Sequence, residues 1–477
     1  MLINSLSFLL FFAVVFFVYY FPLRGNTKYQ NILLLIASYF FYGYADLRLL
    51  PILVGSTLLF YFLGIAMERN TKGQRQNLLM TVGVVAGVGL LLYFKYANFF
   101  IASFAALLQD MGFGTSVHTL NIIAPLGISF YTFRLLSYVI DIQRGKGKPT
   151  NDLVAFSAYV AFFPTILSGP IDRAASFIPQ LEKKRIFNYE MAVDGLRQIL
   201  WGLFKKIVIA DQLALAIGEM DASPSGSTMA LVAVLYLFQL YADFSGYSDM
   251  AIGVGKLLGF RIAVNFNYPL FALNIADYWR RWHISLTGWL TDYIFMPLSV
   301  KWRDWGKWGL ILAILVTFAL IGMWHGAALT FLLFGFYHGL LYVPLILSGA
   351  MFKKNKIKTT FWGLPAWPCA GKMIVTMLLA AFGLVIFRAS GIPQAFDRIH
   401  TIFSSSFFSF PFIAGKQALL FVVIMLIIEW FSRDREFGLQ LVEKIRFRSL
   451  RWLVYFVFLF VIMNYSGNQT AFIYFQF

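Results

Sequence analysis

Charged side chains are scarce in this sequence: only 13% of its 477 residues are Asp, Glu, Lys or Arg. A soluble protein carries about 25% of such residues. Hydrophobic residues reach 60%, and no hydrophilic stretch is long enough to form a soluble domain. Repeated apolar blocks of about 18 residues or more require a lipid bilayer as solvent. The scarcity of charge therefore predicts an all-α, polytopic membrane protein.

Cysteine is almost absent, because Cys369 is the only one. A single thiol excludes a disulfide framework, an iron–sulfur centre and a cysteine-rich metal site. The sequence also contains no Walker-type or GxGxxG phosphate loop, and its histidine spacing matches no zinc signature. We therefore expect no metal and no permanently bound cofactor.

Acidic residues are in the minority, and the formal net charge is +17. The Lys and Arg residues occur in short joints between apolar blocks, as the positive-inside rule predicts, and not as one stripe on a soluble face. We therefore expect no nucleic-acid partner. Membrane lipids and phosphate-bearing substrates are the partners that such basic joints can attract.

The apolar blocks predict roughly eleven membrane-crossing helices and several shorter ones in a single domain over 1–477. The N-terminal spans occupy 1–120, and the core and C-terminal spans occupy 121–477. Arg24 and Lys28 follow the first block, and the most basic segment, Ser432–Arg451, precedes the last. The positive-inside rule places both segments in the cytoplasm and both termini outside it.

Two apolar segments, Asn121–Ile140 and Ala161–Arg173, are interrupted by Pro and Gly, and Arg134 lies in the middle of the first. Such segments are tolerated at membrane depth only inside protein or along a wet cavity. Asp243 and Asp249 lie in another apolar stretch. Acids in that setting are candidates for function, although they can also join helices together with neighbouring serines.

The stretch Asp277–Tyr293 differs most from its surroundings. As one helix, it has an apolar stripe and a polar stripe on roughly opposite sides, and Asp277 reaches Arg281 at i+4. The apolar stripe comprises Trp282, Leu286, Trp289 and Tyr293, and the polar stripe comprises Arg280, His283, Thr287 and Thr291.

The histidines differ in their sequence settings. His118 and His400 lie in polar joints, and His338 is interpreted as a packed, hydrogen-bonded residue of an apolar helix. His325 stands in GMWHGAA, where Gly322 and Gly326 allow another group to approach closely and Trp324 provides a bulky wall. Taken alone, His325 would be interpreted as structural.

His283 and His325 together suit acyl transfer from a thioester to an alcohol. That reaction needs a base for the hydroxyl proton and a donor to the carbonyl oxygen, and imidazole can exchange a proton near neutral pH. Arg280 and Arg281 would shape the site. Alternatively, they pair with Asp277 or anchor the helix to lipid headgroups.

Several motifs resemble the membrane-bound O-acyltransferase superfamily, in particular the bacterial branch of alginate O-acetyltransferase membrane subunits. They run from residue 121 to 477 and comprise PLGISFYTF, SGPIDR, YADFSGYSDMAIGVGKLLGF, NFNYPLFALNIADYWRRWH, GMWHGAA, FRAS and the terminal FIYFQF.

The resemblance implies a ring of helices around a central funnel in a bacterial plasma membrane. It also implies that His325 is the essential catalytic residue and that His283 is the second polar member. Acetyl-CoA would be the cytoplasmic donor, and a separate extracytoplasmic acetyltransferase or polysaccharide-modifying protein would complete delivery to an exported or cell-surface polysaccharide. The alternatives are an acceptor such as peptidoglycan, teichoic acid receiving D-alanine, or a lipid. Two alternatives belong to other functional classes of protein: a secondary transporter and a scaffold.

Overall fold

The computed structural model describes residues 1–70, 73–112, 125–222, 225–353, 356–467 and 470–473. Within these ranges the chain is helical, and its β pairing is limited to an isolated bridge between Thr359 and Pro365. The all-α prediction is confirmed. His118, residues 121–124 and the last four residues of FIYFQF lie outside the described ranges.

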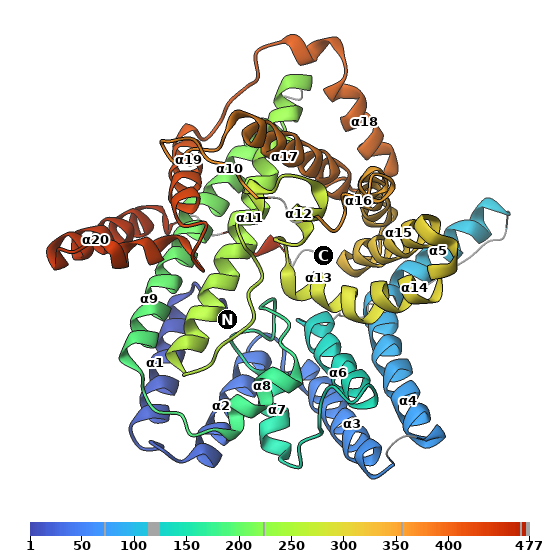
Figure 1. Cartoon of the computed structure of the whole chain (residues 1–477), viewed down its shortest axis with the longest axis vertical. Helices are drawn as coiled ribbons and strands as arrows, with labels where there is room; N and C mark the ends of the chain where they lie inside the picture. Colours follow the sequence, from blue (N-terminus) through green and yellow to red (C-terminus); the bar gives the residue numbers. More distant parts are fainter. Residues whose placement is uncertain (71–72, 113–124, 223–224, 354–355, 468–469, 474–477) are drawn as a thin grey trace. The chain divides into compact units, whose positions relative to one another are not determined.

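The chain forms two compact units (Figure 1). The first contains residues 1–195 and 251–263, and the second contains residues 196–250 and 264–477. Helices α9 (Tyr189–Leu203) and α11 (Gly226–Leu257) run through the division.

The helices of the first unit are mostly apolar, with polar N-caps such as Ser5 and Asn26, whose side chains accept hydrogen bonds from backbone N–H groups. In order they are α1 (Leu6–Tyr20), α2 (Thr27–Gly43), α3 (Leu50–Arg69), α4 (Gln74–Leu91), α5 (Ala97–Asp110), α6 (Ile128–Gln143), α7 (Leu153–Ala161) and α8 (Ala174–Glu182).

Arg134 holds the two interrupted segments of the first unit together. It is 1% exposed on α6 and donates to the carbonyl oxygens of Tyr159 and Val160, each at 3.1 Å, and to that of Pro170 at 3.3 Å. It also contacts the Thr165 hydroxyl. The non-helical backbone after α7 is thus buried in protein, one of the two settings expected for such a segment.

The second unit contains both long and short helices. They are α10 (Asp211–Met220), α12 (Ile275–Trp279), α13 (Ile284–Leu290), α14 (Met296–Lys301), α15 (Gly306–His325), α16 (Leu329–Leu347), α17 (Trp367–Phe387), α18 (Ile392–Ile402), α19 (Lys416–Phe431) and α20 (Arg448–Tyr465), together with most of α11. Figure 1 shows α15 and α16 packed side by side.

Seven helical stretches among the described residues are long and apolar enough to cross a membrane, so the chain is a multi-pass membrane protein. They are Leu47–Arg69, Gln74–Asp110, Gly226–Leu257, Arg303–His325, Leu329–Leu347, Trp367–Phe387 and Arg448–Tyr465. Shorter apolar helices such as α1 are additional. The expected number of roughly eleven crossings stays a prediction.

In the part of the chain that the structure describes, three π-helical segments interrupt the α-helical hydrogen bonding. They are Leu92–Tyr96, Phe204–Ala210 and Thr291–Phe295. The second of them contains Lys205 and Lys206. Both lysines lie inside the continuous helical run from α9 to α10 and are buried.

Candidate active site

The stretch Asp277–Tyr293 is not one helix, which corrects the sequence-based prediction. Helix α12 ends at Trp279, and α13 begins at Ile284. Between them His283 has φ +45° and ψ 52°, the left-handed conformation, which only His283 and Tyr268 adopt among the described non-glycine residues. Left-handed backbone is costly for most side chains and concentrates at functional sites. The break therefore singles out His283.

Asn265 fixes this left-handed turn, and sequence reasoning missed it. The backbone N–H of Ile284 donates to the Asn265 carbonyl oxygen at 2.8 Å. The Asn265 side chain is fully buried, donates to the Ser248 hydroxyl at 3.1 Å and accepts from the Ser285 hydroxyl. The turn next to His283 is thus tied to α11. The only available signal was the run of turn-forming residues in NFNYP.

The predicted apolar stripe is buried despite the break. Trp282, Leu286, Trp289 and Tyr293 are each at most 8% exposed. The predicted polar stripe is not one face of a helix in the structure. Arg280 lies before the break, and His283 lies in the break itself. Thr287 donates to the Trp282 carbonyl oxygen at 3.1 Å and so closes the turn from the other side.

Arg280 and Arg281 both contact Asp277, as one of our three interpretations predicted. Nε of Arg281 lies 3.1 Å from a carboxylate oxygen of Asp277, the predicted i+4 pair, and NH2 of Arg280 lies 3.8 Å from it. Arg280 also donates to the Met351 carbonyl oxygen at 3.1 Å. These contacts hold the short helix α12, and about half of the Arg280 side chain stays accessible.

The Trp324 indole joins the two histidines. Its ring centre lies 5.6 Å from that of His283 at an interplanar angle of 89°, and 4.9 Å from that of His325 at 72°. On its other side His283 packs edge-on against Phe244 of α11, at 4.6 Å. His283 and His325 are 42 positions apart in the sequence; His283 lies in the turn before α13, and His325 ends α15. The structure brings both into contact with one indole.

His325 is the last residue of α15, where glycines allow close helix packing. A Cβ on Gly322 would lie 2.1 Å from the Phe331 carbonyl oxygen, and one on Gly326 would lie 2.4 Å from the Phe331 ring. The prediction that these glycines admit a close neighbour is confirmed, and the neighbour is α16. Phe387 is the last residue of α17, and its ring packs edge-on against His325, with 5.0 Å between the ring centres.

Burial sets the protonation state of His283, which lies outside the candidate spans. Desolvation lowers the pKa of His283 to about 3, because the apolar surroundings disfavour the imidazolium. His283 is therefore neutral at pH 7. A neutral imidazole carries one N–H donor and one acceptor nitrogen. It can donate a hydrogen bond to a carbonyl oxygen without a net charge.

The remaining described histidines have the settings that the sequence indicated. His338 is buried and accepts a hydrogen bond from the Trp279 indole N–H at 3.3 Å, which confirms the structural interpretation. His400 is exposed on α18.

Asp243 and Asp249 form ion pairs with the two buried lysines. Nζ of Lys206 lies 2.8 Å from both Asp243 and Asp211, and Nζ of Lys205 lies 2.6 Å from Asp249. All of these side chains are at most 12% exposed. The contacts support the alternative in which the acids join helices, here α11 to the π segment Phe204–Ala210.

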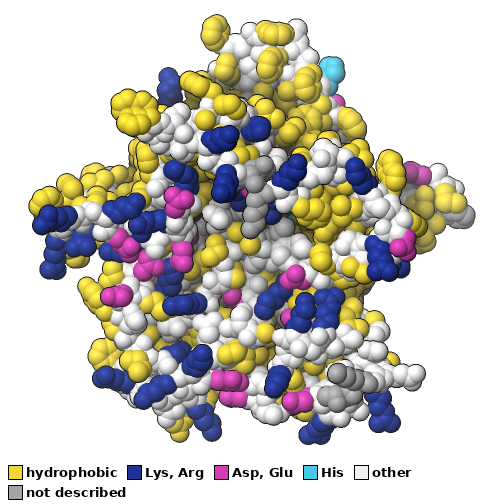
Figure 2. All heavy atoms as spheres, in the orientation of Figure 1, with side chains coloured by type: hydrophobic (Ala, Val, Ile, Leu, Met, Phe, Trp, Pro, Cys, Tyr) yellow, Lys and Arg dark blue, Asp and Glu magenta, His cyan; other side chains and the backbone are white. Residues whose placement is uncertain are grey.

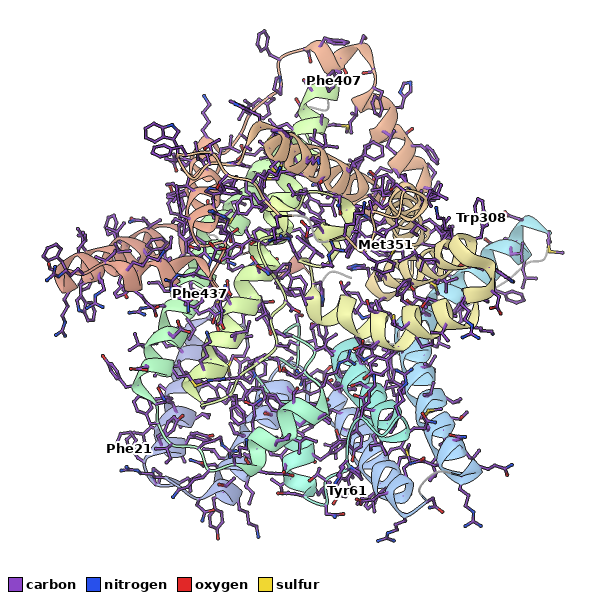
Figure 3. All side chains as sticks on the ribbon, in the orientation of Figure 1. Phe21, Tyr61, Trp308, Met351, Phe407 and Phe437 are labelled. Carbon is purple, nitrogen blue, oxygen red and sulfur yellow. The ribbon has the colours of Figure 1, made fainter. Side chains whose placement is uncertain are left out.

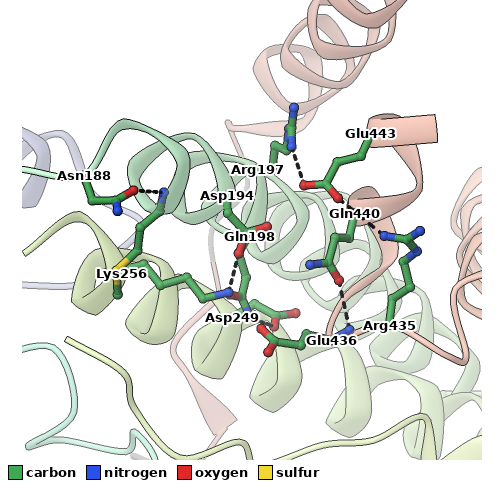
Figure 4. Close-up of polar contacts among 11 residues, drawn as sticks. Asn188, Asp194, Arg197, Gln198, Asp249, Lys256, Arg435, Glu436, Gln440 and Glu443 are labelled. Atoms are coloured by element: carbon green, nitrogen blue, oxygen red, sulfur yellow. Dashed lines mark hydrogen bonds and ion pairs between the residues drawn. The ribbon is translucent and has the colours of Figure 1, made fainter. Parts of the chain in front are cut away.

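A cleft of about 590 Å³ opens beside the His283 turn. Its lining residues are Val264, Phe266, Asn267, Ile284, Asp434, Arg435, Glu436, Gln440 and Lys444. The basic segment after α19 forms one wall, and Figure 4 shows how it is held: Glu443 pairs with Arg197 of α9 at 2.8 Å and with Arg435 at 3.4 Å. Ile284, which lines the cleft, directly follows His283 in the sequence. The cleft therefore lies next to the backbone turn that carries His283, and its volume is typical of small-molecule sites.

These features define a multi-pass helical membrane protein with a paired-histidine site. The model of the membrane-bound O-acyltransferase family matches residues 36–387. The chain is 36% identical to the probable alginate O-acetylase AlgI of Pseudomonas aeruginosa over 413 residues, which cover 85% of this chain and 75% of that protein. It is 33% identical to the peptidoglycan O-acetyltransferase of Helicobacter pylori over 366 residues, 69% of this chain and 67% of that protein.

A more distant similarity connects the chain to the teichoic acid D-alanyltransferase of Bacillus subtilis, at 31% identity over 280 residues, 56% of this chain and 69% of that protein. The chain belongs to the membrane-bound O-acyltransferase family. It is an acyltransferase, and the resemblance noted in its motifs is confirmed.

Proposed function

We propose that this acyltransferase moves an acetyl group from cytoplasmic acetyl-CoA across the bacterial plasma membrane toward hydroxyl groups of an exported or cell-surface polysaccharide. An extracytoplasmic acetyltransferase or another polysaccharide-modifying protein would complete the delivery. The similarity to alginate and peptidoglycan O-acetylating proteins supports an acetyl group and a polysaccharide acceptor.

The packing of His283 and His325 on the same indole is the observation that carries the mechanism. His325 acts as general base and takes the proton of the attacking hydroxyl. The oxygen bonds to the thioester carbonyl carbon, the C–S bond breaks, and the leaving thiolate takes up a proton. His283 is neutral and donates a hydrogen bond to the carbonyl oxygen, on which negative charge develops.

The cleft beside Ile284 is the proposed donor entrance. Arg435 and Lys444 in its wall are the cations proposed to contact the donor's phosphates, and Phe266 and Ile284 supply apolar surface for its pantetheine arm. The carboxylates of Asp434 and Glu436 line the same cleft, and Arg435 also pairs with Glu443. The cleft belongs to the basic segment that the positive-inside rule places in the cytoplasm, where acetyl-CoA is made available.

The test is transfer of a labelled acetyl group from acetyl-CoA by the protein in proteoliposomes, with the intended acceptor or a hydroxyl surrogate. Folded His325→Ala should lose transfer by about 10²-fold to 10⁴-fold. His400→Ala is the matched control, because His400 is exposed, and it should keep full activity. Full activity in folded His325→Ala would refute the assignment.

The similarity to a teichoic acid D-alanyltransferase favours a second candidate, transfer of D-alanine from a carrier protein. The same proteoliposomes can be offered a D-alanyl carrier in place of acetyl-CoA. Transfer from the carrier alone would replace the acetyl proposal, whereas transfer from acetyl-CoA alone would support it.

A further inference from the structure

A small cavity at the end of α17 is lined by two arginines, Arg388 and Arg398. Arg388 is the residue after Phe387, whose ring packs on His325. NH1 of Arg388 donates to a carboxylate oxygen of Asp221 at 3.1 Å. The guanidinium also lies over the Tyr236 ring of α11, 5.3 Å from its centre. Arg388 is therefore already neutralised and held by two neighbours.

Arg398 of α18 lines the same cavity as Arg388, Asp221 and Tyr236. The side chain is half-buried, and the described residues offer it no hydrogen bond or ion pair within 4.0 Å. Burial and the nearby Arg388 lower the pKa of Arg398, but a guanidinium remains protonated at neutral pH. Because Asp221 compensates one arginine only, the cavity carries one uncompensated positive charge.

The cavity has a volume of about 20 Å³ and mostly apolar walls, among them Val232, Leu384 and Ile402. A volume of this size holds a single group about as large as a water molecule. It admits the oxygen of an anion but not a sugar ring. A partly desolvated cation favours such an oxyanion as its partner.

The outer face of α18 is apolar and uncovered. Phe396, Ile399 and Phe403 recur at i, i+3 and i+7 and form one stripe, and the two phenylalanines are 60% and 73% exposed. The segment that follows continues this surface, with Phe408 89% and Phe410 97% exposed. Figure 2 shows hydrophobic side chains gathered at the top of the view, where this segment lies, and Figure 3 marks it by Phe407.

We propose that Arg398 and Arg388 bind the phosphate of a phospholipid headgroup while the phenylalanines of α18 and the following segment lie among its acyl chains. An amphipathic helix with exposed aromatic residues on one face and an arginine beside a small oxyanion cavity matches the chemistry of the membrane interface. The apolar surroundings favour a lipid over a charged polysaccharide, which would bring polar rings against exposed phenylalanine.

The experiment uses the purified full-length protein, delipidated in detergent, and measures binding of phosphatidylglycerol and of the matching diacylglycerol, which lacks the phosphate. Arg398→Gln should weaken phosphatidylglycerol binding by about tenfold, the effect of losing a charge-assisted hydrogen bond. Binding of diacylglycerol should not change. Arg398→Lys, which keeps the charge but not the planar fork, should lie between.

Arg303→Gln is the matched control, because Arg303 is 77% exposed and paired with Asp304 at a different membrane-flanking segment. Size-exclusion profiles verify that each variant is folded. Equal phosphatidylglycerol affinity in folded Arg398→Gln and Arg303→Gln would overturn the proposal. Displacement of the lipid by an oligouronate at comparable concentration would show that the site binds an anionic polysaccharide and would overturn the proposal. Displacement of the lipid by inorganic phosphate would show a free-anion site and would also overturn it.

Discussion

The second unit buries two pairs of side chains that could carry charge, and their neighbours differ in kind. The pairs are the histidines His283 and His325 and the lysines Lys205 and Lys206. The lysines face carboxylates, and Lys206 contacts two of them at 2.8 Å. The histidines face aromatic rings, at distances between 4.6 and 5.6 Å from ring centre to ring centre.

The difference follows from charge. A lysine removed from water keeps its proton only beside an anion, so its carboxylate partners are a condition of burial. A histidine can lose its proton instead and lie against rings as a neutral group. The lysine network is thus committed to joining helices, whereas burial of a neutral imidazole needs no carboxylate partner. The comparison predicts that changes at the lysines affect folding and that changes at the histidines affect chemistry.

The largest expected effect on catalysis beyond His325 comes from His283→Asn. Asparagine tolerates the left-handed backbone, so the turn should form, but the imidazole donor is lost. The rate of acetyl transfer should fall by about 10²-fold or more, with thermal unfolding little changed. Activity assays and unfolding curves on the same preparation separate the two effects. A fully active variant would remove His283 from the mechanism.

Lys206→Met should mainly affect folding. Removing one partner of a buried ion pair costs about 3–5 kcal/mol, and Lys206 neutralises both Asp211 and Asp243. The midpoint of thermal unfolding should drop well below that of Lys205→Met, because Lys205 pairs with one carboxylate, Asp249. The comparison would be broken if the two variants were equally stable.

Asn265→Ala tests whether the distant anchor positions His283. Loss of the side-chain contacts to Ser248 and Ser285 should loosen the turn. Even a displacement of about 1 Å can cost a large factor in rate, so kcat should fall by roughly tenfold while KM for the donor changes less. Asn464, an exposed residue of α20 whose side chain donates to the Phe460 carbonyl oxygen of the same helix at 2.8 Å, provides the control Asn464→Ala. Equal kinetics in the two variants would argue against positioning.

The smallest expected effect concerns pH. Because the pKa of His283 is lowered to about 3, the residue stays neutral throughout the range above that value. Lowering the pH from about 8 to about 5 therefore does not protonate it, and any acid-side loss of activity in that range has another origin. The residual activity of His283→Asn should show the same pH dependence as the unaltered protein. A lost or shifted acid limb would show that His283 titrates near neutrality.

The sequence was sufficient to predict the apolar helices and to single out His283 and His325, which the structure places against one indole. Helix α16 (Leu329–Leu347) is one such apolar helix, and the second glycine of GMWHGAA before it and Ser348 and Gly349 after it mark its ends in the sequence. The Asp277–Arg281 pair and the close approach at Gly322 and Gly326 also agree, since each depends on local spacing.

The remaining features depend on contacts between residues far apart in the sequence. The break at His283 is held by Asn265, and helix periodicity cannot reveal that contact. Lys205 and Lys206 resemble loop residues by charge, and only the distant Asp243 and Asp249 make their burial tolerable. The arginine cavity likewise combines Asp221 with Arg388 and Arg398.

The π segment Phe204–Ala210 has a consequence for protein engineering. A π turn accommodates one residue more than an α turn, so deleting a single residue there should restore regular α pitch and leave the later positions of the helix near their present phase. Lys205 and Lys206 lie within the segment itself, so the deletion would change the directions of their side chains relative to their carboxylate partners. The chain would keep its helix while losing the contacts that make the burial of these lysines tolerable.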